Sequence, residues 1–159
     1  MMKITIISLG RLKEKFFVCA ADEYIKRLSR FCKLSIEEIE PVRLPENPSS
    51  SQIESALSGE GNTVLKRIPE NAFVTALCIE GKKMSSEAFA KVISTAQNTG
   101  KHMVFVIGSS YGLSKSVKQR ADLCLSFSDM TFPHRFFRVM LLEQIYRGFQ
   151  INSGSEYHK

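Results

Sequence analysis

The sequence predicts an α/β domain with a mostly parallel β-sheet and helices on both faces. Three observations predict it. Short runs rich in Ile, Val and Phe recur along the chain, amphipathic segments long enough for helices separate them, and several runs are apolar throughout, as strands covered on both faces are. Because its 159 residues are 43% hydrophobic, the chain fits a single domain over residues 1–159 with a full core.

The expected strands are spread over most of the chain, with helical patterns between them. Interleaving of this kind is typical of parallel sheets, whose crossover connections are helices. In order, the strands are Lys3–Leu9, Lys33–Ile39, Phe73–Ile79, Met103–Ile107 and Leu123–Leu125.

Three helices are expected around these strands. One opens at Ser85 and Ser86, which suit a helix cap, and closes at Gly100. Another runs from Pro133 to about Asn152 and is apolar around most of its circumference, so one face can meet the sheet and another a second subunit. A third covers residues 13–31, and its apolar stripe consists of Phe16, Phe17, Ala20, Tyr24 and Leu28.

Two segments are expected to lie outside the core. Residues 41–51 contain three prolines and three serines, which predicts a mobile surface loop. The last residues, Tyr157, His158 and Lys159, are expected to be disordered unless something docks them. If docked, this tail would offer an aromatic ring, a proton-transfer group and a cation to a nucleobase and its phosphate.

Composition excludes several classes of protein. The four cysteines stand alone within apolar segments, and neither they nor the three histidines have metal-ligand spacing, so we expect buried, reduced thiols and no metal. The first apolar run is too short for a signal peptide or a membrane span, which indicates a cytoplasmic protein without membrane contact.

The positive charge is concentrated in the second half of the chain. Residues 1–80 hold 11 basic and 11 acidic side chains, whereas residues 81–159 hold 11 and 5, so the second half carries the whole excess of six. This asymmetry favours contact of that half with a nucleic acid or nucleotide, although basic surface also serves solubility.

Ligands of parallel sheets bind beyond the carboxyl ends of the strands, and glycines mark several of these ends. The turn from Gly108 to Gly112 allows close approach of its backbone to a ligand, but it matches neither a dinucleotide fingerprint nor a Walker A loop. Judged alone, it is as well explained by folding as by ligand binding.

The segment from Leu125 to His134 is a second candidate for a ligand loop. Its hydroxyl-rich residues follow a strand, and Phe132-Pro133 starts a helix abruptly without a side-chain cap. The first amides of that helix are then available to a ligand, to loop carbonyls or to water. Near the helix start, His134 is explained by a surface position, and Arg138 either by an ion pair or by an anion contact.

Four motifs together resemble a known family. They are Phe105–Leu113, Leu125–His134, Arg138 through Arg147 with its Glu143-Gln144 pair, and the closing Tyr157-His158-Lys159. The chain resembles the ribosomal RNA large subunit methyltransferase H family of the SPOUT superfamily over essentially its whole length. The resemblance implies methylation of N3 of a pseudouridine in 23S rRNA within the ribosome, with S-adenosylmethionine as cofactor. It also implies a homodimer and a C-terminal trefoil knot.

Once this reaction is supposed, the N3 proton must leave, and a nearby cation or weak base would help. Arg138 and His158 are therefore the candidate catalytic residues, and Tyr157 and Lys159 would join them in binding the substrate. The resemblance itself implies cofactor residues. Ser109 departs from the family's usual second glycine, and Asp129 from a position that is often basic. The cofactor contacts would be Leu77, Gly108, Phe127, Ser128, Asp129, Met130, Thr131 and Phe132.

Two other functions remain open at this point. A ribose 2′-O-methyltransferase of the same superfamily would share the cofactor loop, and a noncatalytic ribosome- or RNA-binding module would share the basic second half. The methyl sulfonium of S-adenosylmethionine is a strong electrophile, so the scarcity of nucleophiles and metal ligands in the chain is compatible with methyl transfer.

Overall fold

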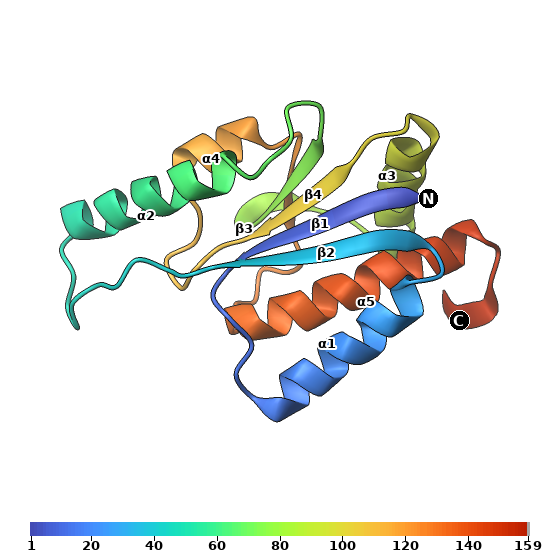
Figure 1. The fold of residues 1–159 in the computed structure, drawn as a ribbon, viewed down its shortest axis with the longest axis horizontal. Coiled ribbons are helices and arrows are strands. Elements are labelled where there is room, and N and C mark those ends of the chain that lie inside the picture. Colours follow the sequence, from blue (N-terminus) through green and yellow to red (C-terminus); the bar gives the residue numbers. More distant parts are fainter. Residues whose placement is uncertain (159) are drawn as a thin grey trace.

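Five parallel strands form one sheet in the order β2-β1-β4-β3-β5 (Figure 1). The structure is a computed structural model that describes residues 1–158, with the backbone alone for His158. Lys159 and the side chain of His158 therefore lie outside the described residues. The strands are β1 (Met2–Leu9), β2 (Cys32–Ile39), β3 (Phe73–Lys83), β4 (Met103–Ile107) and β5 (Leu123–Ser126).

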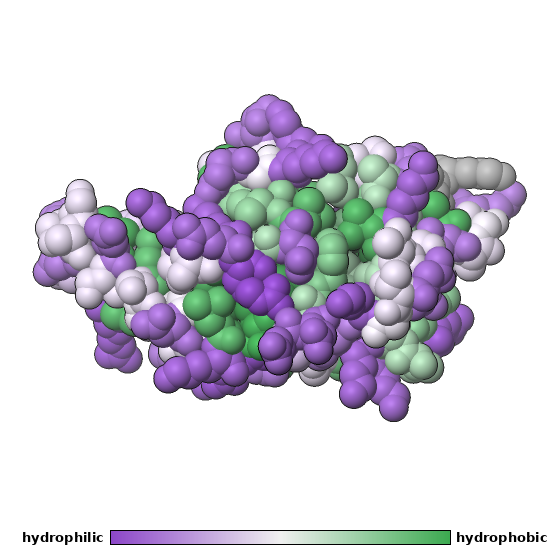
Figure 2. Space-filling model, turned by 90° about the horizontal axis from the view of Figure 1, so that it is seen from above, coloured by the Kyte–Doolittle hydropathy of each residue, from purple (hydrophilic) through white to green (hydrophobic). Residues whose placement is uncertain are grey.

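Helices cover both faces of the sheet, as the sequence predicts (Figure 1). One apolar layer joins the sheet to α1 (Lys15–Leu28), α3 (Ser86–Asn98) and α5 (His134–Asn152). The other joins it to α2 (Ser50–Leu65) and α4 (Lys115–Arg120). Figure 2 views the molecule from above Figure 1 and shows hydrophobic residues between hydrophilic rims, so this face is only partly covered by polar side chains.

All five expected strands are confirmed, and the expected helices are confirmed with ends shifted by a few residues. The loop predicted over residues 41–51 is wrong at its end, because α2 begins at Ser50. Ser49 and Gln52 form a reciprocal capping box, in which each side chain bonds the other residue's backbone N–H. This capping box starts a helix within a segment whose prolines and serines predict a loop.

The prediction of uniformly buried cysteines is also wrong. Cys19 is exposed, Cys32 is buried, and Cys78 and Cys124 are half-buried. Cys19 lies on α1, whose buried face is formed by Phe17, Ala21 and Leu28. Phe16, which the sequence assigns to this stripe, is 65% exposed because it lies beside Phe17 rather than on the same face.

Strand β3 extends further than expected and changes register against β5. Leu125 of β5 pairs first with Leu77 and again with Lys82, so the residues between them bulge out of the ladder. A Cβ at Gly81 would lie 2.7 Å from the Cys124 carbonyl atoms, which shows why glycine is required where β3 passes over β5.

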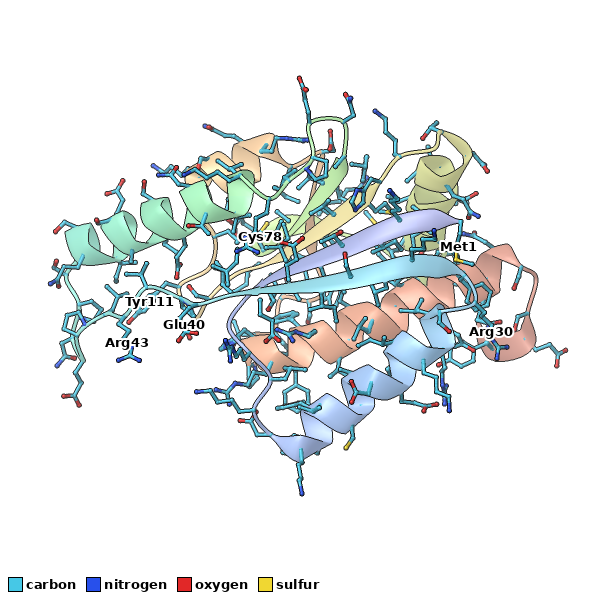
Figure 3. The ribbon with its side chains drawn as sticks, in the orientation of Figure 1. Met1, Arg30, Glu40, Arg43, Cys78 and Tyr111 are labelled. Atoms are coloured by element: carbon cyan, nitrogen blue, oxygen red, sulfur yellow. The ribbon has the colours of Figure 1, made fainter. Side chains whose placement is uncertain are left out.

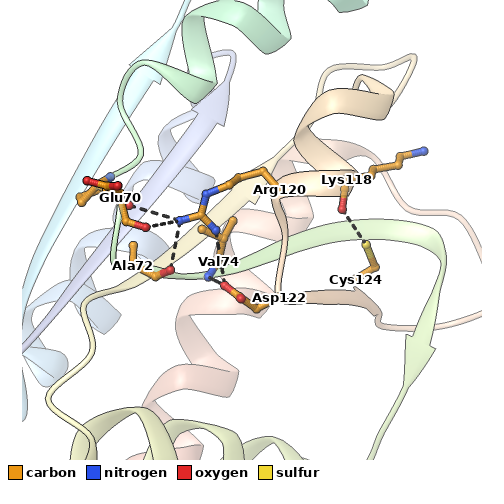
Figure 4. A network of polar contacts seen from close by, with 8 residues as sticks. Glu70, Ala72, Val74, Lys118, Arg120, Asp122 and Cys124 are labelled. Atoms are coloured by element: carbon orange, nitrogen blue, oxygen red, sulfur yellow. Dashed lines mark hydrogen bonds and ion pairs between the residues drawn. The ribbon is translucent and has the colours of Figure 1, made fainter.

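Arg120, at the end of α4, forms hydrogen bonds with the segment that leads into β3 (Figure 4). Its guanidinium donates to the carbonyls of Glu70 and Ala72, at 3.0 and 3.3 Å. Asp122 accepts the backbone N–H of Val74 at 2.8 Å and lies 3.6 Å from the same guanidinium. The network fixes the start of β3 and thereby the position of its carboxyl end.

None of the helices within residues 1–158 is long and apolar enough to cross a membrane.

Candidate cofactor and substrate site

A cavity of about 490 Å³ opens at the carboxyl ends of β3, β4 and β5. Leu77, Ile107 and Leu125 line it at the level where these three neighbouring strands pair with one another. In Figure 3, Cys78 and Tyr111, which line the cavity, lie toward the end of the sheet that is opposite to Met1. This is where ligands of parallel sheets are expected, and the volume suits a ligand of nucleoside size.

The turn from Gly108 to Gly112 forms one wall of the cavity. The N–H of Gly112 donates to the Ser109 carbonyl at 2.9 Å and closes the turn. A Cβ at Gly108 would lie 2.5 Å from the Gly112 carbonyl oxygen, and Gly112 has φ +88°. The turn is therefore possible only with glycine at both positions.

The loop after β5 forms the facing wall. The Ser126 hydroxyl donates to the Ser128 carbonyl at 3.1 Å, and the Ser128 hydroxyl accepts the Met130 N–H at 3.0 Å. The rings of Phe127 and Phe132 both contact Phe137 of α5, with ring centroids 5.8 and 6.1 Å apart. These contacts hold an apolar surface toward the cavity.

Six of the eight predicted cofactor residues line this cavity, namely Leu77, Gly108, Phe127, Ser128, Thr131 and Phe132. The other two lie at the exposed tip of the loop. The side chain of Asp129 is 82% exposed and pairs with Lys83 at 2.6 Å, and Met130 is 72% exposed. The structure therefore does not bring these two side chains to the cavity wall.

Several residues that were not predicted from the sequence line the cavity where β3 bulges. Cys78 and Glu80 lie there, with Lys118 of α4 opposite. Lys118 and Glu80 form an ion pair, and this hydrogen bond lowers the pKa of the Glu80 carboxyl. Burial, followed by the neighbouring Cys124, raises the pKa of the Cys78 thiol to about 12, so this thiol is neutral. For Cys78 and Glu80 the available signal is their position between Leu77 and Gly81 at a glycine-marked strand end, whereas no local signal places Lys118 of α4 there.

His134 lies at the first turn of α5 and also lines the cavity. Its pKa is lowered by burial and then by the cations Arg135 and Arg138, so the ring is neutral near pH 7. Arg135 in turn pairs with Glu14, which ties the start of α5 to the start of α1. His134 is thus a half-buried wall residue and not the surface histidine that the sequence favours.

Arg138 is only 5% exposed. Its guanidinium donates to the Gly10 carbonyl at 2.9 Å and to the Glu38 carboxyl at 3.4 Å. The sequence leaves an ion pair and an anion contact open for Arg138. The structure shows the ion pair, with Glu38 as the partner. The pair lies at the carboxyl ends of β1 and β2, next to the cavity but outside its lining.

Tyr157 of the tail lies at the other end of α5. Its ring contacts Tyr146 edge-on, with centroids 5.0 Å apart, and the Arg147 guanidinium lies 5.0 Å from its centroid. His134, at the cavity, precedes Tyr146 by three helical turns, or roughly 18 Å at 1.5 Å per residue. Within one protomer the structure does not bring Tyr157 to the cavity.

A second hollow, of about 460 Å³, lies between the start of α3 and the outer side of α5. Phe89, Phe127, Val139 and Met140 give it an apolar lining, and Phe127 is shared with the first cavity. The outer side of α5 is therefore apolar and partly open, as the sequence predicts for a helix that is buried on more than one side.

Comparison with known proteins decides the family. A sequence profile of a family described as predicted SPOUT methyltransferases matches residues 2–158. The chain belongs to this SPOUT methyltransferase family. Among its relatives, the ribosomal RNA large subunit methyltransferase H of Clostridium kluyveri is 49% identical over 159 residues, covering 99% of this chain and 100% of the relative. The protein of the same name from Clostridium botulinum strain Kyoto is 51% identical with the same coverage.

Solved structures agree with this SPOUT methyltransferase at the level of the fold. A probable methylase family protein from Haemophilus influenzae Rd KW20 superimposes with a TM-score of 0.56 at 11% identity, covering 99% of this chain and 71% of that one. A putative methylase family protein from Neisseria gonorrhoeae gives 0.53 at 13% identity, with 91% and 82% covered. The predicted α/β fold and methyltransferase activity are confirmed, whereas the trefoil knot stays a prediction.

SPOUT methyltransferases generally use S-adenosylmethionine, and the cavity fits it. The volume of the cavity is large enough for a nucleoside, and the strand ends and Phe127 supply apolar walls. The Gly108–Gly112 turn presents its backbone to the cavity in a shape that a Cβ at Gly108 would disturb. These are the features of a nucleoside pocket in which backbone groups approach the ligand closely.

Proposed function

We propose that this protein methylates N3 of a pseudouridine in 23S rRNA within the ribosome, with S-adenosylmethionine as methyl donor. The observation that carries the proposal is the identity of 49–51%, over the full length of both chains, to relatives named ribosomal RNA large subunit methyltransferase H. The basic second half of the chain supports an RNA partner, because phosphate contacts dominate the affinity for nucleic acids.

In this proposal the predicted cofactor residues act mainly through shape and backbone. Leu77 and Phe127 would contact the adenosine with their apolar surfaces, and the backbone of Gly108 and of residues 127–132 would supply its hydrogen bonds. When bound, S-adenosylmethionine supplies an activated methyl group. Because no nucleophile of the protein is then required, the protein's task is to align the acceptor nitrogen with that methyl group.

The acceptor N3 carries a proton that must leave, and a nearby cation would stabilise the anion that results. We assign this role to Arg138 and His158, with Tyr157 and Lys159 binding the substrate nucleotide. Arg138 would do so by exchanging its Glu38 partner for the substrate. Tyr157 would stack on or hydrogen-bond to a base.

A homodimer would resolve the separation between the tail and the cavity. Since Tyr157 lies about three turns of α5 away from the cavity wall in one protomer, the tail of a second copy would reach the cavity more easily. The apolar hollow beside α5 supports this association, because a second copy would cover Val139 and Met140 there.

One experiment tests the proposal against its alternatives. Protein and labelled S-adenosylmethionine are incubated with assembled ribosomes, isolated 23S rRNA or tRNA, and the modified nucleoside is identified by mass spectrometry. We expect label in 23S rRNA of assembled ribosomes and a methyl group on the base of a pseudouridine. A ribose-methylated nucleoside would indicate a 2′-O-methyltransferase. No binding of S-adenosylmethionine in calorimetry would indicate a noncatalytic module.

A further inference from the structure

Glu60 is a buried acidic residue that the proposed chemistry does not use. It lies on α2 and is 4% exposed. Its carboxyl oxygens accept the backbone N–H of Val42 at 3.0 Å and the hydroxyl of Ser109 at 3.3 Å. Burying a carboxyl group is unfavourable unless its oxygens accept hydrogen bonds. These two hydrogen bonds therefore explain how Glu60 can be buried.

The two partners of Glu60 come from different parts of the fold. Val42 belongs to the connection between β2 and α2, and Ser109 belongs to the cofactor turn after β4. Tyr111 of that turn and Val42 and Leu44 of the connection line a common small cavity. Glu60 therefore links α2 and this connection to the turn through hydrogen bonds.

The turn is poorly supported by packing. Ser109, Ser110 and Tyr111 line both the 490 Å³ cavity and a third, smaller cavity of about 170 Å³. A Cβ added to Gly112 would meet no atom within 4 Å. A thin segment that lines two cavities is free to shift unless a directional contact holds it.

We propose that Glu60 is a positioning residue of the cofactor site, which holds the Gly108–Gly112 turn through the Ser109 hydroxyl in the shape that S-adenosylmethionine binds. The inference rests on the proposed use of that cofactor. It also gives Ser109 a purpose, because a glycine at this position would leave Glu60 without its hydroxyl partner.

The test measures the affinity for S-adenosylmethionine by calorimetry in wild type, Ser109→Ala, Glu60→Leu and their double variant. Losing a hydrogen bond to an acidic group should raise the Kd by roughly three- to tenfold in either single variant, and the double variant should lose little more. Glu60→Gln should retain wild-type affinity, because its amide oxygen can accept from Val42 and its amide nitrogen can donate to Ser109. The matched control is Glu54→Gln on the exposed face of α2, which should not change the Kd.

Hydrogen exchange of the cofactor-free protein supplies an independent readout. The Gly112 amide, which donates within the turn, should exchange faster in Ser109→Ala and Glu60→Leu than in Glu60→Gln or wild type. In the methylation assay the single variants should raise the KM for S-adenosylmethionine and leave kcat nearly unchanged.

Additive losses in the double variant would overturn the proposal, because Ser109 would then act on the cofactor independently of Glu60. Unchanged Kd in both single variants, with wild type binding normally, would overturn it as well and leave the proposed function intact. If wild type itself failed to bind S-adenosylmethionine, both the proposed function and this inference would be wrong.

Discussion

Gly108 shapes the wall of the cavity because it has no Cβ atom. Its missing Cβ leaves room for the Gly112 carbonyl, which would otherwise lie at 2.5 Å. The atoms that a Cβ at Gly108 would meet are backbone atoms of the same turn, so the turn itself has to move when a side chain is added. If they belonged to a flexible side chain, that side chain could rotate away.

We therefore expect Gly108→Ala to raise the Kd for S-adenosylmethionine at least roughly tenfold, which calorimetry will measure. Gly59→Ala is the control, since its nearest neighbour is a Val42 methyl group at 4.0 Å. Replacing this exposed helical glycine should raise the free energy of unfolding by about 0.5–1 kcal/mol and leave cofactor affinity unchanged. Equal affinities of Gly108→Ala and wild type would contradict the assignment of this turn to the cofactor.

His134 predicts a pH dependence of stability. Its pKa is lowered from 6.5 by burial, so between the lowered value and 6.5 the unfolded chain binds more protons than the folded one. Stability is then full above about pH 6.5 and is lost as the pH falls through this window. We expect Tm to fall less between pH 7 and 5.5 in His134→Gln than in wild type, as measured by calorimetric scans.

His102 requires its own variant in that experiment, because burial and then Lys3 lower its pKa as well. The double variant with His102→Gln should show the smallest pH dependence of the series. An identical pH dependence in wild type and His134→Gln would show that His134 does not contribute.

Among the contacts between helices and strands, Arg120 connects α4 to the start of β3. The guanidinium donates to several carbonyls and also pairs with Asp122, which bonds the Val74 N–H (Figure 4). Arg120→Lys cannot reproduce these contacts, because an ammonium group lacks the planar fork of the guanidinium. We expect Arg120→Ala and Arg120→Lys each to lower the free energy of unfolding by about 1–3 kcal/mol in urea titrations. A lysine variant as stable as wild type would show that charge alone suffices there.

Helices α3 and α5 approach each other at a second glycine, Gly148. A Cβ there would lie 2.6 Å from Cδ1 of Ile93, the far end of a flexible side chain. Gly148→Ala should therefore lower the free energy of unfolding by about 1–3 kcal/mol through overpacking. Ile93→Val removes the obstructing methyl group, so the double variant should lose less than the sum of the single variants. Additive losses would indicate that the overpacking lies elsewhere.

The distance between the tail and the cavity predicts a site that two copies of the protein share. A heterodimer can combine one protomer that carries the Gly108→Ala cavity with another that lacks residues 157–159. If tail and cavity act across the dimer, this mixture has one intact site. At an S-adenosylmethionine concentration below the Kd of Gly108→Ala, it should then be more active than either parent dimer. No such gain in heterodimers isolated by two affinity tags would contradict the shared site. Undiminished methylation by the parent that lacks residues 157–159 would show that the tail has no catalytic role.

The alternation of apolar strands and helical patterns determined the α/β class, because backbone pairing and the burial of apolar faces follow local periodicity. Local signals also identified two of the cavity walls, the Gly108–Gly112 turn and the loop after β5. They predicted a loop where the capping box of Ser49 and Gln52 starts α2. They also gave no sign of the change in register at the β3 bulge. The contacts to the cofactor and the knot stay predictions.

Which distant residues meet follows from the arrangement of the elements in space. It paired Arg138 with Glu38 and Ser109 with Glu60, and it separated Tyr157 from the cavity. Each of these depends on the order of strands in the sheet and on the direction in which α5 crosses it, and local sequence pattern encodes neither. The physical reason is that periodicity reports which face of an element is buried, whereas long-range contacts depend on which elements become neighbours.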